Sequence, residues 1–425
     1  MSCELINRAH LAGVSTSHAV WRHFAATLDV SHQQQPPQHF VDEVLDASIR
    51  NPCVLSAPRD PKHTREVVAW LAEQWRLRRW TVPSEFQLDS FPDVDDTVDL
   101  FYKTYTGWGG GPLGPGITLM ESSGGITRST TGLTTWCGAA VLAEWVANNP
   151  TVVAGKRVLE LGAGVGFSAS AILTSPDTEH LPPSSYFATD CHHQVLTLLH
   201  HNLTLNLADP PLQRACLEEF RARVSHQLEE ERLVTPEEKC EEPLPWSPPA
   251  AATTDPTHAT LAVVREEEDG QGCVGVMQVD WRHPPRLPPV DVVLAADVVY
   301  CRNLIQPLVS LLRSILEGSD GQKEQRQPQQ EAQRDSGEKG CNSEEEMRAT
   351  DGGGLRKQEA FLACTRRSHE TLSLFLQEVT RQGLQYTLVF QASMDADTAL
   401  FVYNEIHLPV KVYKITLPRE DTREH

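Results

Sequence analysis

The chain has 425 residues, of which 40% are hydrophobic and 22% charged, a composition typical of a soluble globular protein with room for a full α/β core. Its net charge of −20 argues against broad contact with a nucleic-acid backbone, and it has no run of about 18 apolar residues that would predict a membrane span. The N-terminal MSCELINRAHLAGV lacks the basic region and the apolar stretch of a secretory signal.

The ten cysteines contain no C-x-x-C pair and no even framework. Scattered cysteines of this kind favour reduced thiols in a cytosolic or nuclear protein, and we expect a cytoplasmic one. The histidine pairs at 192–193 and 200–201 lack ligand spacing with cysteines or carboxylates, so no metal site is expected.

The first 106 residues are expected to form a mostly helical region. Val67, Leu71 and Trp75 recur at the spacing of helical turns, as do apolar residues between 40 and 49. A glycine-rich break follows at 107–116. Residues 117–121 and 126–130 then flank a Ser-Ser-Gly-Gly turn, which predicts a short hairpin.

The rest of the chain alternates between strands and helices. A helix that is apolar on most sides starts near Trp136, as expected of a buried helix. Apolar strands with helical crossovers predict a doubly wound α/β fold, whose mostly parallel sheet is covered on both faces. The predicted strands are 158–161, 186–189, 274–279, 291–297, 361–365, 387–390 and 410–417; the predicted helices open at Phe167, cover 193–206 and end at Gln382.

Two stretches interrupt this order, at residues 209–272 and 317–357. Both are rich in Pro, Gln, Glu, Ser or Gly and poor in apolar residues. Such segments cannot bury enough apolar surface to offset the entropy of ordering, so we expect disordered surface insertions.

The loop at Gly162–Gly166 directly follows a predicted strand and precedes a predicted helix. Its small residues let the backbone approach a ligand, and the helix N-terminus directs N–H groups at that ligand. A dinucleotide fingerprint needs a glycine at position 167, where this chain has Phe167. Glu160 places negative charge where a sulfonium fits better than a pyrophosphate. The loop therefore favours S-adenosylmethionine; an ordinary strand-to-helix turn is the alternative.

Acidic residues follow three further predicted strands. Asp190 could accept hydrogen bonds from both ribose hydroxyls of a nucleoside, or cap the following helix. Trp281, after Asp280, could cover an adenine face, although plain packing would also explain it. Asp297 ends a strand where ligands gather in doubly wound sheets, and the small Ala296 before it leaves room for one; a helix cap is again the alternative.

Several segments taken together resemble the family-16 protein-lysine methyltransferases, a branch of the seven-strand, class I methyltransferases. The similar segments are VLELGAGVGF, TGLTTWCGAAVLAEW, FATDCHHQVLTLLHHNLTLN, QVDW and DVVLAADVVY. Two others, VLDASIRNPCV and GITLMESSGGITRSTTGLTTW, narrow the resemblance to members that act on eukaryotic elongation factor 2. The resemblance implies a Rossmann-like methyltransferase domain over residues 107–417, followed by a tail at 418–425.

The resemblance also implies the cofactor S-adenosyl-L-methionine and elongation factor 2 as protein substrate. Asp190 would lie at the ribose, and Asp297 and Tyr300 match a D-x-x-Y element where the target lysine enters. The family commonly has an acid after the tryptophan, and Cys137 in its place puts any role of that acid in doubt. The remaining implied cofactor contacts are Trp136, Gly162, Ala163, Gly164, Trp281 and Ala296.

A lysine must be neutral to attack a sulfonium methyl, so the expected contribution of the enzyme is placement and desolvation of the amine. Asp297 and Tyr300 are the candidates to orient this amine or accept its proton. Three alternatives stay open: a methyltransferase for another protein lysine or a small molecule, a non-catalytic module that keeps the fold, and an NAD-dependent oxidoreductase. Phe167 argues against the last of these.

Overall fold

The computed structural model describes residues 2–31, 35–50, 60–86, 100–106, 116–122, 130–176, 181–208, 213, 261–265, 272–318, 358–392 and 409–418. Most of the two predicted insertions, residues 126–129 of the predicted hairpin and nearly all of the tail lie outside the described residues.

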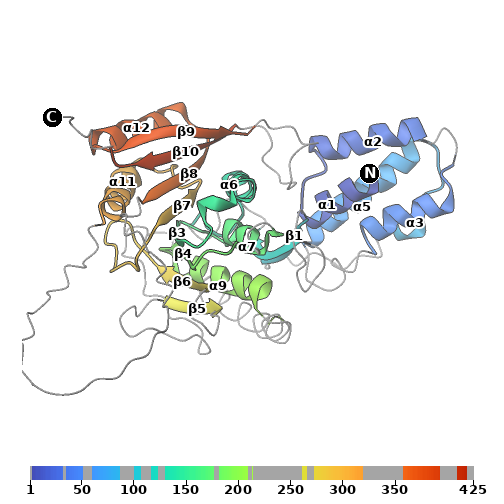
Figure 1. Cartoon of the computed structure of the whole chain (residues 1–425). Helices are drawn as coiled ribbons and strands as arrows, with labels where there is room; N and C mark the ends of the chain where they lie inside the picture. Colours follow the sequence, from blue (N-terminus) through green and yellow to red (C-terminus); the bar gives the residue numbers. More distant parts are fainter. Residues whose placement is uncertain are drawn as a thin grey trace, which may run out of the picture.

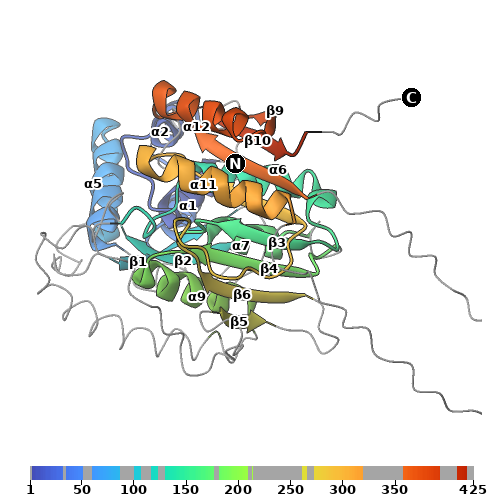
Figure 2. The ribbon, with the colours of Figure 1, turned by 90° about the vertical axis from the view of Figure 1, so that its left-hand side faces the viewer.

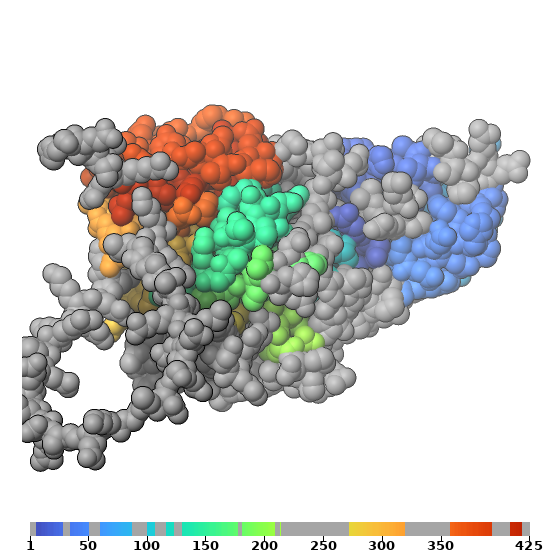
Figure 3. Space-filling model, in the orientation of Figure 1, coloured from blue at the N-terminus to red at the C-terminus, as the bar shows by residue number. Residues whose placement is uncertain are grey.

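The N-terminal region is helical, as predicted. Its helices are α1 (Ser2–Leu11), α2 (Ala19–Ser31), α3 (Gln38–Ala47) and α5 (Pro61–Leu77), followed by a 3₁₀ turn at Ser84–Phe86. Asp60 caps α5 by accepting the backbone N–H of Lys62 at 2.8 Å. Val67, Leu71 and Trp75 are all buried on one face of α5, which confirms the periodicity. These helices gather at one end of the molecule (Figures 1 and 3).

A twisted sheet forms the other part of the molecule, with strand order β5-β6-β4-β3-β7-β8-β10-β9. The pairs β6-β4, β4-β3, β3-β7 and β7-β8 are parallel, whereas β10 runs antiparallel to both β8 and β9 and β5 runs antiparallel to β6. The doubly wound, mostly parallel prediction is confirmed. The strands are β3 (Arg157–Leu161), β4 (Ser185–Asp190), β5 (Leu261–Arg265), β6 (Cys273–Gln278), β7 (Val292–Ala296), β8 (Glu359–Thr365), β9 (Gln385–Gln391) and β10 (Val410–Thr416).

Helices cover both faces of the sheet because alternate strand residues point to opposite sides (Figure 2). Val158 and Leu294 face the core formed with α6 (Cys137–Ala147), α7 (Phe167–Thr174) and α9 (His193–Leu207). Their neighbours Leu159 and Val293 face the core formed with α11 (Arg302–Leu316) and α12 (His369–Arg381). The first core continues into the N-terminal helices, so the helical region and the sheet share one apolar cluster.

A separate hairpin joins the helical region to the sheet. It pairs β1 (Leu100–Tyr105) with β2 (Ile117–Ser122) in antiparallel register. Two asparagines of α9 hold β2 through their side-chain amides: Asn202 exchanges hydrogen bonds with both backbone groups of Met120 at 2.8 and 3.0 Å, and Asn206 does the same with Thr118 at 3.0 and 2.8 Å. α9 therefore takes the place that a neighbouring strand would have.

The structure differs from the sequence prediction in three elements. β2 pairs with β1, which lies before the predicted boundary at residue 106, whereas its predicted partner at 126–130 lies almost entirely outside the described residues; that boundary stays a prediction. Residues 261–265 form the edge strand β5 within a stretch predicted to be a disordered insertion, because Leu-Ala-Val-Val suits a strand once β6 offers a free edge. The helix α11 was not predicted.

Candidate active site

A cavity of about 590 Å³ opens at the carboxyl ends of β3, β4 and β7. This is the edge at which doubly wound sheets bind ligands. All ten residues predicted from the sequence as site residues line it. They are Trp136, Glu160, Gly162, Ala163, Gly164, Asp190, Trp281, Ala296, Asp297 and Tyr300.

The glycine loop forms the floor of this cavity between β3 and α7. A Cβ atom on Gly162 would lie 2.8 Å from Val298 and 3.3 Å from the indole of Trp281, and the glycine has φ of +66°. Any side chain there would be strained and would clash with Val298. The glycine therefore lets Val298 and Trp281 pack closely against the loop.

Glu160 is buried at the end of β3. The hydroxyls of Ser168 and Tyr186 donate to its two carboxylate oxygens, the second at 2.8 Å. Burial raises the pKa of Glu160 to about 7, although both hydroxyl donors lower it. Its negative charge therefore depends on pH near neutrality, and a cation in the cavity would favour the charged form.

Replacing Glu160 with glutamine should make stability less dependent on pH. Because burial raises the folded-state pKa from its usual 4.5 to about 7, the contribution of this carboxyl is complete below about pH 4.5 and is lost as the pH rises through about 7. Relative to the native protein, Glu160→Gln should gain up to about 3 kcal/mol in the free energy of unfolding between pH 4.5 and 8. Urea unfolding across this range measures the difference. If the free energy of unfolding of the two proteins changed with pH in parallel, burial would not raise the pKa of Glu160 as described.

Asp190 ends β4 and faces the glycine loop. One carboxylate oxygen accepts the backbone N–H groups of Cys191 and His192 at 2.8 and 3.1 Å, and the other accepts that of Gly164 at a longer 3.3 Å. Burial raises the pKa of Asp190, and the three backbone donors lower it. The first oxygen binds the turn before α9 and does not cap the helix, whose N-cap is His192, whereas the second oxygen is directed at the glycine loop.

Two tryptophans form walls of the cavity. Trp281 lies over Gly162, after Asp280, whose carboxylate pairs with Arg282 at 2.7 Å. Trp136 donates its indole N–H to the carbonyl of Thr131 at 2.8 Å. The guanidinium of Arg367 lies 4.1 Å above the Trp136 ring, a cation–π contact that fixes the orientation of the indole.

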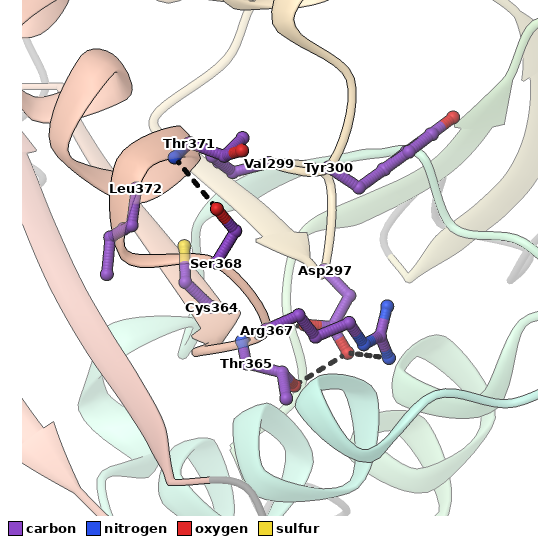
Figure 4. A pocket seen from close by; sticks show the side chains of 9 residues that line it. All are labelled: Asp297, Val299, Tyr300, Cys364, Thr365, Arg367, Ser368, Thr371 and Leu372. Carbon is purple, nitrogen blue, oxygen red and sulfur yellow. Dashed lines mark hydrogen bonds and ion pairs between the residues drawn. The ribbon is translucent and has the colours of Figure 1, made fainter.

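Asp297 anchors α6 to the sheet. Its carboxylate accepts the N–H of Gly138 at 3.0 Å, the N–H of Thr365 at 2.8 Å and the hydroxyl of Thr365 at 2.9 Å, with Arg367 at 3.7 Å (Figure 4). Trp136, the first residue of the α6 turn, supplies no side-chain cap, so Asp297 caps this helix from another element. A Cβ on Gly138 would lie 2.7 Å from the Asp297 carboxylate carbon, which explains the glycine.

Asp297 itself adopts a left-handed backbone with φ of +54°, which is unusual for a residue other than glycine. Its side chain is only 5% exposed. Strain of this kind persists where the surrounding bonds over-determine the conformation, and it is concentrated at functional sites.

Tyr300 lies at the mouth of the cavity and is half exposed. Its ring points away from the Asp297 carboxylate, so the structure brings these two candidates to one site without bringing their polar atoms together (Figure 4). A smaller cavity of about 120 Å³ lies beside them and is also lined by Thr365, Arg367 and Leu372.

Cys137, in the position of the family acid, is buried with its sulfur 3.0 Å from the Thr365 hydroxyl. That hydroxyl donates to Asp297, so a carboxylate at 137 would stand close to a second buried carboxylate. The thiol removes this like-charge repulsion.

Sequence reasoning missed Arg367, Thr365 and the threonines of residues 130–135 that line the cavity. Thr365 and Arg367 follow β8, far from the glycine loop in sequence, and no motif marks them. The repeated threonines before Trp136 were the available indication for the loop.

Within the described part of the chain, no group of three or more His, Cys, Asp or Glu side chains could hold a metal ion. The same residues include no helix with the length and apolar character needed to cross a bilayer.

No protein-family model matches the chain. Curated relatives include proteins named protein-lysine N-methyltransferases. The chain is 27% identical to EEF2KMT of Bos taurus over 383 residues, covering 88% of this chain and 86% of the relative. It is 28% identical to EEF2KMT of Homo sapiens over 310 residues (72% and 66%) and 40% identical to EFM3 of Chaetomium thermophilum over 98 residues (23% and 28%).

Among solved structures, the chain matches precorrin-6y C5,15-methyltransferase of Geobacter metallireducens with a TM-score of 0.31 and 11% identity, covering 69% of this chain and 93% of that one. Ribosomal protein L11 methylase of Lactobacillus delbrueckii has a TM-score of 0.31 and 9% identity, covering 71% and 95%.

The doubly wound, mostly parallel sheet, the cavity at the carboxyl ends of its strands and the curated relatives define the chain as an S-adenosylmethionine-dependent methyltransferase. Within that class it is similar to the protein-lysine N-methyltransferases of family 16, as the sequence segments indicate.

Proposed function

We propose that this methyltransferase transfers methyl groups from S-adenosylmethionine to a lysine of eukaryotic elongation factor 2. The observation that carries the proposal is the similarity to bovine EEF2KMT over 383 residues. That match is longer than the whole chain after residue 106, so it includes part of the helical N-terminal region. A shared cofactor domain alone would not account for it.

The residues that line the cavity support the following placement of the cofactor. The cavity beside Gly162 would receive it, and Asp190 would accept the ribose hydroxyls with the oxygen that faces the loop. Trp281 would cover the adenine, and Glu160, in its charged form, would favour the cationic methionine end. Trp136, Ala163, Gly164 and Ala296 complete the walls.

When bound, the cofactor supplies a methyl group on a sulfonium centre, which a neutral amine can attack. The half-exposed Tyr300 would orient the lysine at the mouth of the cavity, where the amine gives its proton to water as it leaves solvent and becomes desolvated. Asp297 has three donors on its carboxylate and so acts by holding Gly138 and the start of α6 in place. This assignment changes the expected role of Asp297 from contact with the amine to placement of the cavity wall.

We also propose a cytoplasmic location, where elongation factor 2 would be accessible. The ten cysteines, scattered without a C-x-x-C pair, are in keeping with a reducing compartment.

The decisive test uses the purified protein, isotopically labelled S-adenosylmethionine and a lysate from cells that lack this enzyme. Mass spectrometry should find the label on a lysine of elongation factor 2. Label found solely on other molecules would show that elongation factor 2 is not the substrate. Binding of S-adenosylhomocysteine without any transfer would favour a cofactor-binding module, and binding of NAD in its place would favour an oxidoreductase.

A further inference from the structure

Glu121 is a fully buried carboxylate on β2, outside the cavity. Its Oε1 accepts the hydroxyl of Tyr105, and the Lys103 ammonium lies 3.8 Å from the same oxygen. Its Oε2 accepts the hydroxyl of Thr134 at 3.2 Å and the backbone N–H of Thr135. Each of these partners directs a donor at Glu121, and the Lys103 ammonium and the Thr135 N–H can only donate, so the position favours a side chain with acceptors on both oxygens.

Two of these donors belong to the loop that leads into Trp136. Residues 130–132 and 134–136 line the cofactor cavity, and Trp136 is the N-cap residue of α6. The residue after Glu121 binds the same loop, because the backbone N–H of Ser122 donates to the carbonyl of Leu133 at 2.6 Å. β2 thus holds this loop through a carboxylate and through its backbone.

The other two partners connect Glu121 to the N-terminal side of the molecule. Lys103 and Tyr105 lie on β1, and a Cβ on Gly13, after α1, would come within 3.2 Å of the Lys103 side chain. The Tyr105 ring packs edge-on against Phe167, the first residue of α7, at 4.9 Å between centroids. One buried carboxylate therefore contacts the hairpin and the cavity wall at the same time.

We propose that Glu121 is a positioning residue for cofactor binding: it fixes the loop at residues 130–136, and with it Trp136, against the β1-β2 hairpin. The proposal rests on the proposed function only for the identity of the cofactor. It also gives the hairpin and the helical region behind it a part in shaping the cavity, besides any part in recognising a protein substrate.

Glu121→Gln tests this directly. The amide keeps the shape of the side chain, but its NH₂ group replaces one carboxylate oxygen and so faces groups that donate hydrogen bonds. Isothermal titration with S-adenosylhomocysteine should show a Kd at least about tenfold higher than in the native protein, since charge-assisted hydrogen bonds to the loop are lost. The KM for S-adenosylmethionine should rise, while kcat at saturating cofactor should change less than about threefold, because no group at the reacting atoms is altered.

Thr104→Val is the matched control. It removes a buried hydrogen bond of 3.0 Å to Thr118 within the same hairpin and leaves the loop untouched. Its Kd for S-adenosylhomocysteine should stay within about twofold of the native value even if its melting temperature falls as much as that of Glu121→Gln. Equal losses of affinity in the two variants, or a folded Glu121→Gln with native affinity, would overturn the proposal.

Should Glu121→Gln not fold, Tyr105→Phe decides, since it keeps the ring against Phe167 and removes one donor. It should raise the Kd several-fold, and a native Kd would reject the proposal. None of these titrations contains an acceptor lysine, so failure to methylate elongation factor 2 would leave the inference standing. A native protein that does not bind S-adenosylhomocysteine would overturn both.

Discussion

Replacing Asp297 with alanine should lower the free energy of unfolding by about 3 kcal/mol, because it leaves the N–H groups of Gly138 and Thr365 without their buried, charge-assisted acceptor. The start of α6 would lose its cap, and Trp136, the N-cap residue of this helix, would no longer be held in position. We therefore expect weaker binding of S-adenosylmethionine together with the loss of transfer. Urea unfolding and cofactor titration on the same samples measure both effects.

Tyr300→Phe provides the contrast, because this residue is half exposed and its hydroxyl lies away from the Asp297 carboxylate. It should keep native stability and cofactor affinity while slowing transfer. If Asp297→Ala instead abolished transfer with stability and cofactor affinity unchanged, Asp297 would act on the acceptor amine, as the D-x-x-Y resemblance alone suggests.

Asp190→Ala should raise the Kd for S-adenosylmethionine about a hundredfold. The expected loss is two hydrogen bonds from ribose hydroxyls to a charged acceptor, worth roughly 3 kcal/mol together. Isothermal titration measures the change. Asp190→Asn should recover part of the affinity, since it keeps an acceptor oxygen in place.

Asp291→Ala is the control for this prediction. Asp291 is also a buried carboxylate, at the opposite ends of the strands, where it holds Arg157 through hydrogen bonds of 2.8 to 2.9 Å. Its loss should lower stability without changing the Kd for the cofactor. A similar rise in Kd for both variants would show that Asp190 acts through stability and not through the ribose.

Much of the fold could be predicted because the central strands are apolar, short and followed by helices. The parallel strands β3, β4 and β7 came within one residue of their predicted ends, and α7 began at the predicted Phe167. β1 could not be found in the same way. Its partner β2 lies after a glycine-rich stretch, and no sequence pattern near β1 indicates that the two segments pair. α11 was overlooked although it is strongly amphipathic, with Leu308, Leu312 and Ile315 buried and its polar side chains outward.

The cavity could be predicted where function requires a residue type at a strand end, as at Asp190, Trp281 and Asp297. What the sequence does not contain is the direction of each side chain. The sequence left Asp297 as a candidate to contact the amine or to cap a helix, and only the approach of β8 and α6 shows that its oxygens are occupied. Nothing in the sequence distinguishes Arg367 from the other arginines; only the fold brings its guanidinium over the ring of Trp136.

The two asparagines of α9 have a consequence for the order in which the protein is made. They bind Met120 and Thr118 across 82 and 88 positions of sequence, so β2 leaves the ribosome long before either partner exists. The backbone groups of Thr118 and Met120 on β2 therefore lack these hydrogen bonds until residue 206 has been synthesised. A nascent chain that ends before α9 would already contain the glycine loop. It would lack the hydrogen bonds by which α9 holds β2, and β2 in turn fixes residues 130–136 at the side of the cavity. Competence to bind the cofactor is therefore a late event in the synthesis of this chain.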